Sequence, residues 1–136
     1  MAEISLTKPL HLTMNVTDAE DRLPSLELTV TIQSTPFTTS FACETSTWFT
    51  CADWDHFSTA LARLSLGQQA TLRDMSDEFR LTMEHRLDDT YQLTIECHQP
   101  AIGRGVTRFS FCALLEADEV ADVVEAFKAF PRWWQE

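Results

Sequence analysis

The stretch Leu26-Glu-Leu-Thr-Val-Thr-Ile-Gln33 decides the fold class, because apolar and polar residues alternate along it without a break. Successive side chains of a β-strand point to opposite faces, so this pattern predicts a strand with one buried and one exposed face. Residues 10–16 and 37–43 alternate in the same way, with a polar loop over 17–22 and a turn signal at Ser34-Thr-Pro36. Three such segments in succession predict an antiparallel meander.

The period then changes to that of a helix. Apolar residues recur at three- and four-residue spacing, the stripe of an amphipathic helix: Trp54, Phe57, Leu61 and Leu64. Thr50 with Asp53 three positions later is similar to a capping box, and Gly67 stands where a helix-ending glycine is expected. The spacing therefore predicts a helix over about 51–66.

Strand patterns resume after this helix, and a second helix closes the sequence. The predicted strands cover 69–73, 78–85, 91–98 and 106–112. A helical stripe then runs over 118–130 until Pro131, whose ring cannot continue a helix. The order β-β-β-α-β-β-β-β-α predicts a single α+β domain over residues 1–136, with an antiparallel β-sheet of about six to seven strands and two α-helices packed on it. A parallel nucleotide-binding fold would need strands and helices to alternate.

Charge limits the classes of partner. The 136 residues carry 10 basic and 21 acidic side chains, giving a net charge of −11, while 44% hydrophobic residues are enough for a core. Phosphate backbones and anionic membrane surfaces are bound by clustered Lys and Arg, so we expect neither nucleic acid nor a membrane as partner. A basic protein remains as a partner that fits the charge.

Neither a secretory signal pattern nor an apolar run of about 20 residues is visible, so we expect a cytoplasmic protein. The cysteines form no C-x-x-C pair and are expected to be buried free thiols: Cys43, Cys51, Cys97 and Cys112. This spacing argues against a zinc site.

No catalytic signature is present. The sequence has no G-x-S-x-G, its histidines are scattered, and Gly103-Arg-Gly105 is typical of a turn between strands rather than a phosphate-binding loop. We therefore expect a protein that is not an enzyme, without catalytic residues, cofactor or metal. The alternative is a ligand cavity or active site between sheet and helices that uses Arg80, Arg108, His85 and the cysteines.

Two features favour protein binding. Acidic side chains gather in the predicted 17–22 loop and on the exposed face of the last helix, where they would steer a basic partner. Tryptophan is enriched at interface hot spots, although the adjacent pair near the C-terminus is also expected to dock back onto the domain. The candidate partner-binding residues are Asp18, Glu20, Asp21, Asp122, Glu125, Trp133 and Trp134.

The chain also resembles a known family. The resemblance lies in the strand patterns at 79–83 and 91–97 and in a set of largely apolar positions: Trp48, Asp53, Phe57, Leu61, Leu64, Gly67, Ala70 and Leu72. Over about Trp48 to Phe111 it is similar to the WapI-like immunity proteins of bacterial polymorphic-toxin systems. That resemblance implies a small acidic protein that neutralises a cognate toxin by binding it. We expect a monomer or a homodimer. The alternative is an acidic type III secretion chaperone, which would have an amphipathic N-terminal helix.

Overall fold

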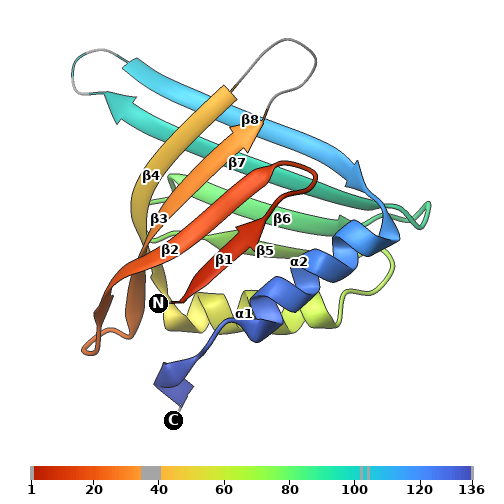
Figure 1. Cartoon of the computed structure of the whole chain (residues 1–136), viewed down its shortest axis with the longest axis horizontal. Coiled ribbons are helices and arrows are strands. Elements are labelled where there is room, and N and C mark those ends of the chain that lie inside the picture. The colour runs from red at the N-terminus through yellow and green to blue at the C-terminus, as the bar shows by residue number, and fades with distance from the viewer. Residues whose placement is uncertain (1, 35–40, 102, 104, 136) are drawn as a thin grey trace.

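The computed structural model describes residues 2–34, 41–101, 103 and 105–135. The elements follow one another along the chain (Figure 1) as β1 Glu3–Leu6, β2 His11–Glu20, β3 Ser25–Ser34, β4 Phe41–Thr50, α1 Cys51–Ala62, β5 Gln69–Arg73, β6 Phe79–His85, β7 Tyr91–Ala101, β8 Gly105–Leu115, α2 Ala117–Ala129 and the short 3₁₀ helix η1 Trp133–Gln135. No helix in the described ranges is long and apolar enough to cross a membrane.

The eight strands form two antiparallel sheets of four. The first sheet has the order β1-β2-β3-β4 and the second the order β5-β6-β7-β8. The predicted α+β class with antiparallel pairing and two helices is confirmed, but the strands divide between two sheets where a single sheet of six to seven was expected. Each half of the chain has the same order, a four-stranded meander followed by one helix.

The alternating segments of β2, β3, β6 and β7 bury the faces that their apolar phases predict, whereas in β4 Phe41 is exposed and Cys43 only partly buried. In β3 the side chains of Leu26, Leu28, Val30 and Ile32 are fully buried. One core cluster unites the inner faces of both sheets with α1 and α2. Figure 1 shows the sheets crossing each other, with the two helices along their lower side; α1 lies beside β5, and α2 lies beside β1 and α1.

Aromatic side chains occupy the place where the two sheets and the helices meet. Phe49 of β4 makes edge-to-face contacts with Trp54 of α1 at 6.0 Å and with Phe79 of β6 at 5.8 Å between ring centroids. Trp54 also contacts Phe127 and Phe130 at the end of the chain, at 5.4 Å and 4.7 Å. Edge-to-face pairs of this kind stabilise a core beyond the area they bury.

Several boundaries differ from the sequence prediction. The predicted 17–22 loop is wrong for its first part, because β2 continues past an irregularity between Val16 and Asp18 and pairs with β3 as far as Glu20. The strand β1 was missed, since four residues give too short a pattern. Residues 37–40 of the predicted third strand lie outside the described residues. The strand there, β4, runs from 41 to 50, and its polar inward residues Thr45 and Thr47 conceal the alternation.

The predicted starts of both helices agree with the structure, whereas the predicted end of the first helix does not. The hydroxyl of Thr50 accepts a hydrogen bond from the Asp53 N–H at 3.0 Å, so Thr50 is the N-cap of α1. Gly67, however, does not end this helix, which stops at Ala62. Gly67 lies in the following turn with φ +81°, where its N–H donates to the carbonyl of His85 at 2.7 Å. The second helix ends before Pro131 as predicted.

Candidate functional site

The acidic residues of the first predicted group lie on one hairpin. Asp18 and Glu20 are the last part of β2, and Asp21 begins the turn to β3; all three side chains are exposed. The Asp18 carboxylate accepts the N–H of Ala19 at 2.8 Å, and Glu20 accepts the N–H of Arg22 at 3.0 Å. No ion pair within the described ranges involves these three acids. Their charges therefore face solvent without a compensating cation in contact.

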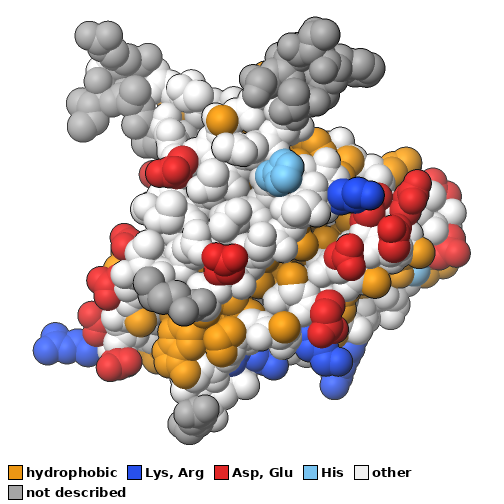
Figure 2. Space-filling model, viewed as in Figure 1, with side chains coloured by type: hydrophobic (Ala, Val, Ile, Leu, Met, Phe, Trp, Pro, Cys, Tyr) orange, Lys and Arg blue, Asp and Glu red, His pale blue; other side chains and the backbone are white. Residues whose placement is uncertain are grey.

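The second group lies on α2, where Asp122 and Glu125 are both exposed and likewise form no ion pair with any described residue. The β2–β3 hairpin and this helix lie on opposite sides of the molecule as drawn in Figure 1. Figure 2 shows acidic side chains at both places, with a largely uncharged surface between them. The structure therefore brings together the members of each group but does not join the two groups into one patch.

The two tryptophans have different surroundings. The Trp134 indole Nε1–H donates to both carboxylate oxygens of Asp55 in α1, at 3.0 and 3.1 Å, and Arg132 lies 3.5 Å from the same carboxylate. Trp133 packs edge-to-face on Trp134 at 5.2 Å and keeps 38% of its surface exposed. Trp134 thus docks back onto the domain, whereas Trp133 remains accessible to a partner. Figure 2 shows hydrophobic side chains gathered between the two chain ends.

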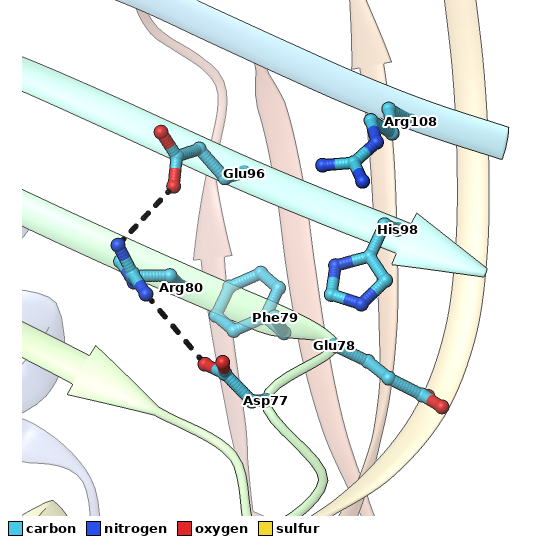
Figure 3. Close-up of a pocket in the computed structure, with 7 residues that line it drawn as sticks. All are labelled: Asp77, Glu78, Phe79, Arg80, Glu96, His98 and Arg108. Carbon is cyan, nitrogen blue, oxygen red and sulfur yellow. Dashed lines mark ion pairs between the residues drawn. The ribbon is translucent and has the colours of Figure 1, made fainter. Parts of the chain in front are cut away.

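An open hollow of about 280 Å³ lies on the outer face of the second sheet (Figure 3), and it contains two of the residues named for a ligand site, Arg80 and Arg108. Arg80 forms ion pairs with Asp77 and Glu96, each at 3.6 Å. His98 projects into the hollow from β7 and lies between Arg108 and Glu78, whereas Arg80 lies on the other side of Phe79. Since acids contact Arg80 on both sides, its charge is already compensated, and among the described residues that line the hollow only Arg108 offers a cation to a ligand.

The sequence did not single out Glu96 or His98 as neighbours of these arginines. Glu96 and His98 occupy the polar positions of the alternating pattern in β7. That pattern indicates that their side chains point outward, but it does not indicate which strands lie beside β7. The pairing of Arg80 with Glu96 and of His98 with Arg108 across adjacent strands creates the hollow.

His85, the third residue of the ligand-site alternative, lies at the other end of β6. Its ring stacks on Tyr91 with centroids 4.1 Å apart, and its Nε2 lies 2.7 Å from a carboxylate oxygen of Asp89. The structure therefore separates His85 from Arg80 and Arg108, which occupy the hollow.

The cysteines are unlike one another. Cys43 and Cys97 meet between β4 and β7 with sulfur atoms 3.3 Å apart, and Cys51 is buried at the start of α1. The expectation of four buried thiols is wrong for Cys112, which is exposed on the outward phase of β8, and holds only in part for Cys43, which is partly buried. Burial raises the pKa of Cys97 to about 12, with its hydrogen bond to Cys43 adding to the shift, and burial together with Asp55 raises the pKa of Cys51 to about 11. Protonated thiols are poor nucleophiles.

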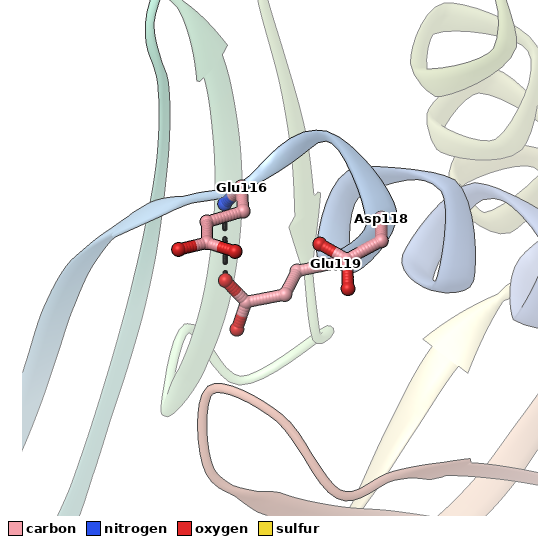
Figure 4. Close-up of side chains that lie close together, drawn as sticks. All are labelled: Glu116, Asp118 and Glu119. Carbon is pink, nitrogen blue, oxygen red and sulfur yellow. Dashed lines mark hydrogen bonds between the residues drawn. The ribbon is translucent and has the colours of Figure 1, made fainter.

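Three acids gather at the start of α2 (Figure 4): Glu116, Asp118 and Glu119, with carboxylate oxygens within 4.8 Å of one another. The Glu119 carboxylate accepts the N–H of Glu116 at 3.0 Å, and the Glu116 side chain accepts the N–H of Glu119, which is a capping box. Their position is explained by the helix N-terminus, where the backbone dipole favours negative charge.

No protein-family model matches the chain, and neither a curated protein nor a solved structure matches it.

Proposed function

We propose that this chain is a non-enzymatic protein-binding module, an immunity protein that neutralises a basic toxin by covering it. One observation carries the proposal. Five exposed acids on the β2–β3 hairpin and on α2 form no ion pair with any described residue: Asp18, Glu20, Asp21, Asp122 and Glu125. Acids that are not neutralised within their own chain retain their full attraction for a basic partner.

The position of these acids also supports the proposal. Four of the five stand on a strand or a helix and Asp21 stands in the turn directly after β2, so little ordering entropy is lost when a partner engages them. Trp133 adds an exposed aromatic side chain, the residue type that most often anchors an interface. With a net charge of −11, the whole molecule contributes to long-range steering of a basic partner.

The test begins with co-purification of the full chain from its native host and identification of the bound protein. Expressing that protein with and without this chain then shows whether growth arrest occurs and is relieved. We expect an affinity that falls as salt is added, because exposed charges are screened. A captured protein without toxicity, or a toxicity that this chain does not relieve, would contradict the immunity role.

Charge-reversal variants locate the contact. Asp122→Lys with Glu125→Lys is expected to weaken binding at least about tenfold if α2 is the contact, and Asp18→Lys with Asp21→Lys does the same for the hairpin. The matched control is Glu3→Lys with Glu44→Lys, which changes two exposed acids of the first sheet and alters the net charge by the same amount. If the control weakens binding equally, net charge alone acts and neither group is the binding surface.

The two alternatives receive less support. The first element in the structure is the strand β1, where the secretion-chaperone alternative expects an amphipathic helix. The ligand-site alternative relies on a hollow that is open to solvent and whose Arg80 is already paired with two acids. An open, charge-compensated surface offers a small molecule little burial.

A further inference from the structure

The edge strand β8 is the least protected part of the two sheets. Each other edge has a neighbour: α2 lies beside β1, α1 lies beside β5, and β4 receives hydrogen bonds on two carbonyl groups, from the Met75 N–H to Trp48 at 2.7 Å and from the Gln99 side-chain amide to Glu44 at 2.8 Å. In the part of the chain that the structure describes, the backbone of β8 bonds only to β7. Figure 1 shows β8 at the outer side of its sheet.

The residues of β8 also lack the features that keep an edge strand from pairing. Natural edge strands are blocked by charged side chains, above all lysine, by proline, by a bulge or by a short length. The eleven residues Gly105–Leu115 contain one charged side chain, Arg108, and neither lysine nor proline, and their register with β7 is regular throughout. Val106 and Leu114 are 50% and 57% exposed. A long, regular and partly apolar edge of this kind favours pairing with another strand.

Charge and sequence indicate which strand that is. We propose that β8 pairs with β8 of a second copy of this chain, antiparallel and centred on Ser110, which joins the two second sheets into one continuous eight-stranded sheet. The chain as a whole is acidic, but residues 105–115 of β8 contain no acidic side chain and one basic side chain, Arg108. Two copies can therefore meet along this edge without placing like charges opposite each other, because Arg108 faces Cys112 of the second copy.

The same register is self-complementary along its whole length. Phe109 stands opposite the second copy's Phe111, Val106 stands opposite its Leu114, and Ser110 stands opposite itself on the twofold axis. Aromatic pairs and pairs of apolar residues are the cross-strand contacts that stabilise antiparallel sheets. The interface is isologous, the type that closes as a dimer.

The inner side of β8 leaves space for these contacts. A hollow of about 420 Å³ lies beside Phe109 and Phe111, and Ser34 and Phe41 form its other wall. Both phenylalanines of β8 are only partly buried in one copy, and Phe41 is 48% exposed. In the proposed dimer the second copy's phenylalanines approach this hollow and complete its cover.

Sedimentation velocity over a concentration series tests the dimer. We expect a species of twice the 15.5 kDa chain mass that gains population as salt is added, because screening weakens repulsion between two copies of charge −11. Binding of a basic partner changes with salt in the opposite direction, so the two proposals fail separately. A chain that stays monomeric at every concentration and salt level overturns the dimer.

Two variants locate the interface on β8. Ser110→Lys places like charges opposite each other on the axis and is expected to raise the dimer dissociation constant roughly tenfold. Ala42→Lys, an exposed change on β4, is the matched control and is expected to leave it unchanged. Circular dichroism and thermal melting of both variants verify the fold. If Ser110→Lys has no effect on a dimer that does form, the interface lies elsewhere and the proposal is overturned.

Cross-linking provides a second, independent readout. In a Cys112→Ser background, Ser110→Cys places two thiols across the axis at the spacing of an antiparallel pair, about 4.5–5.5 Å between Cα atoms, within the range of a disulfide. As the two thiols introduced by Ser110→Cys form the disulfide, they release two electrons and two protons. Oxidised glutathione accepts these and becomes two molecules of reduced glutathione. We expect a covalent dimer to form much faster than with Ala42→Cys in the same background. Equal rates contradict the register.

Discussion

At the scale of single residues, Asp74 connects the two halves of the molecule. Asp74 is buried, with 6% of its surface exposed. One of its carboxylate oxygens accepts hydrogen bonds from the N–H groups of Glu78 and Phe79 at 2.8 and 3.1 Å. The other oxygen accepts the hydroxyl hydrogen of Thr47 in β4. Thus one side chain from the second half satisfies donors from both sheets. Nothing in the sequence distinguishes this aspartate from other turn acids, because the Thr47 hydroxyl that it binds lies 27 positions away in the chain.

Replacing Asp74 tests this role. Asp74→Ala leaves three donors without an acceptor, of which the Phe79 N–H and the Thr47 hydroxyl are buried, and we expect a loss on the order of 3 kcal/mol in the free energy of unfolding, measured by urea denaturation. Asp74→Asn retains an acceptor for the two N–H groups and should lose less. Asp122→Ala on the exposed helix face is the control. Equal effects of the two alanine variants would contradict the bridging role.

The buried thiols predict how stability depends on alkaline pH. The pKa values of Cys51 and Cys97 are raised to about 11 and about 12 in the folded protein, whereas the ordinary value is 9.0. Their contribution is therefore fully present below pH 9.0 and is lost as the pH rises towards about 12, since the unfolded chain ionises first.

Urea denaturation at about pH 8 and about pH 10.5 measures this effect. We expect lower stability at the higher pH, and a smaller decline in Cys97→Ala, although that variant starts from a lower stability because it loses core packing. The exposed Cys112→Ala is the control. A decline that Cys97→Ala leaves unchanged would contradict the assignment to this thiol.

At the scale of elements, the ends of the helices can be predicted from the sequence more closely than the bounds of the strands. A helix is a local structure, so its cap at Thr50 and its stop before Pro131 are visible in neighbouring residues. The β4 strand was placed only in part, because burial of Thr45 and Thr47 depends on the opposite sheet. The docking of η1 on α1 likewise depends on a contact between residues 79 positions apart, Trp134 and Asp55.

Asp55→Ala tests that docking. Without the carboxylate, Trp134 and Arg132 lose their common partner, and we expect a red-shifted tryptophan emission and faster tryptic cleavage after Arg132. The expected loss in the free energy of unfolding is about 1.5–3 kcal/mol, the range for a hydrogen bond to a charged group. Asp53→Ala, on the same helical turn and exposed, is the matched control. Unchanged emission and cleavage in Asp55→Ala would contradict the docking role.

At the scale of the whole molecule, two sheets and two helices share one hydrophobic core. Phe49 stands at their junction, in contact with Trp54 and Phe79. Because a common core couples the two halves, the prediction of a single domain over residues 1–136 leads us to expect that both halves unfold in one cooperative transition.

Phe49→Ala measures this coupling. Removal of the ring is expected to cost about 3–5 kcal/mol in the free energy of unfolding. Tryptophan fluorescence and far-ultraviolet circular dichroism should still show one coincident transition, shifted to lower denaturant. Two separate transitions, in the parent protein or in the variant, would contradict a single cooperative domain. Exposed Phe41→Ala is the control, and its effect on monomer stability should be much smaller.

The sequence by itself determined the α+β class, the antiparallel strands and the phase of their buried faces, because these depend on periodicity within short segments. It also indicated the Thr50 cap of α1 and the acids of the β2–β3 hairpin and α2. Only the tertiary structure decided that the strands form two sheets, that Cys43 meets Cys97, and that Arg80 and Arg108 line one hollow. Period-2 alternation shows which side of a strand is buried, but it carries no information about the distant segment that buries it.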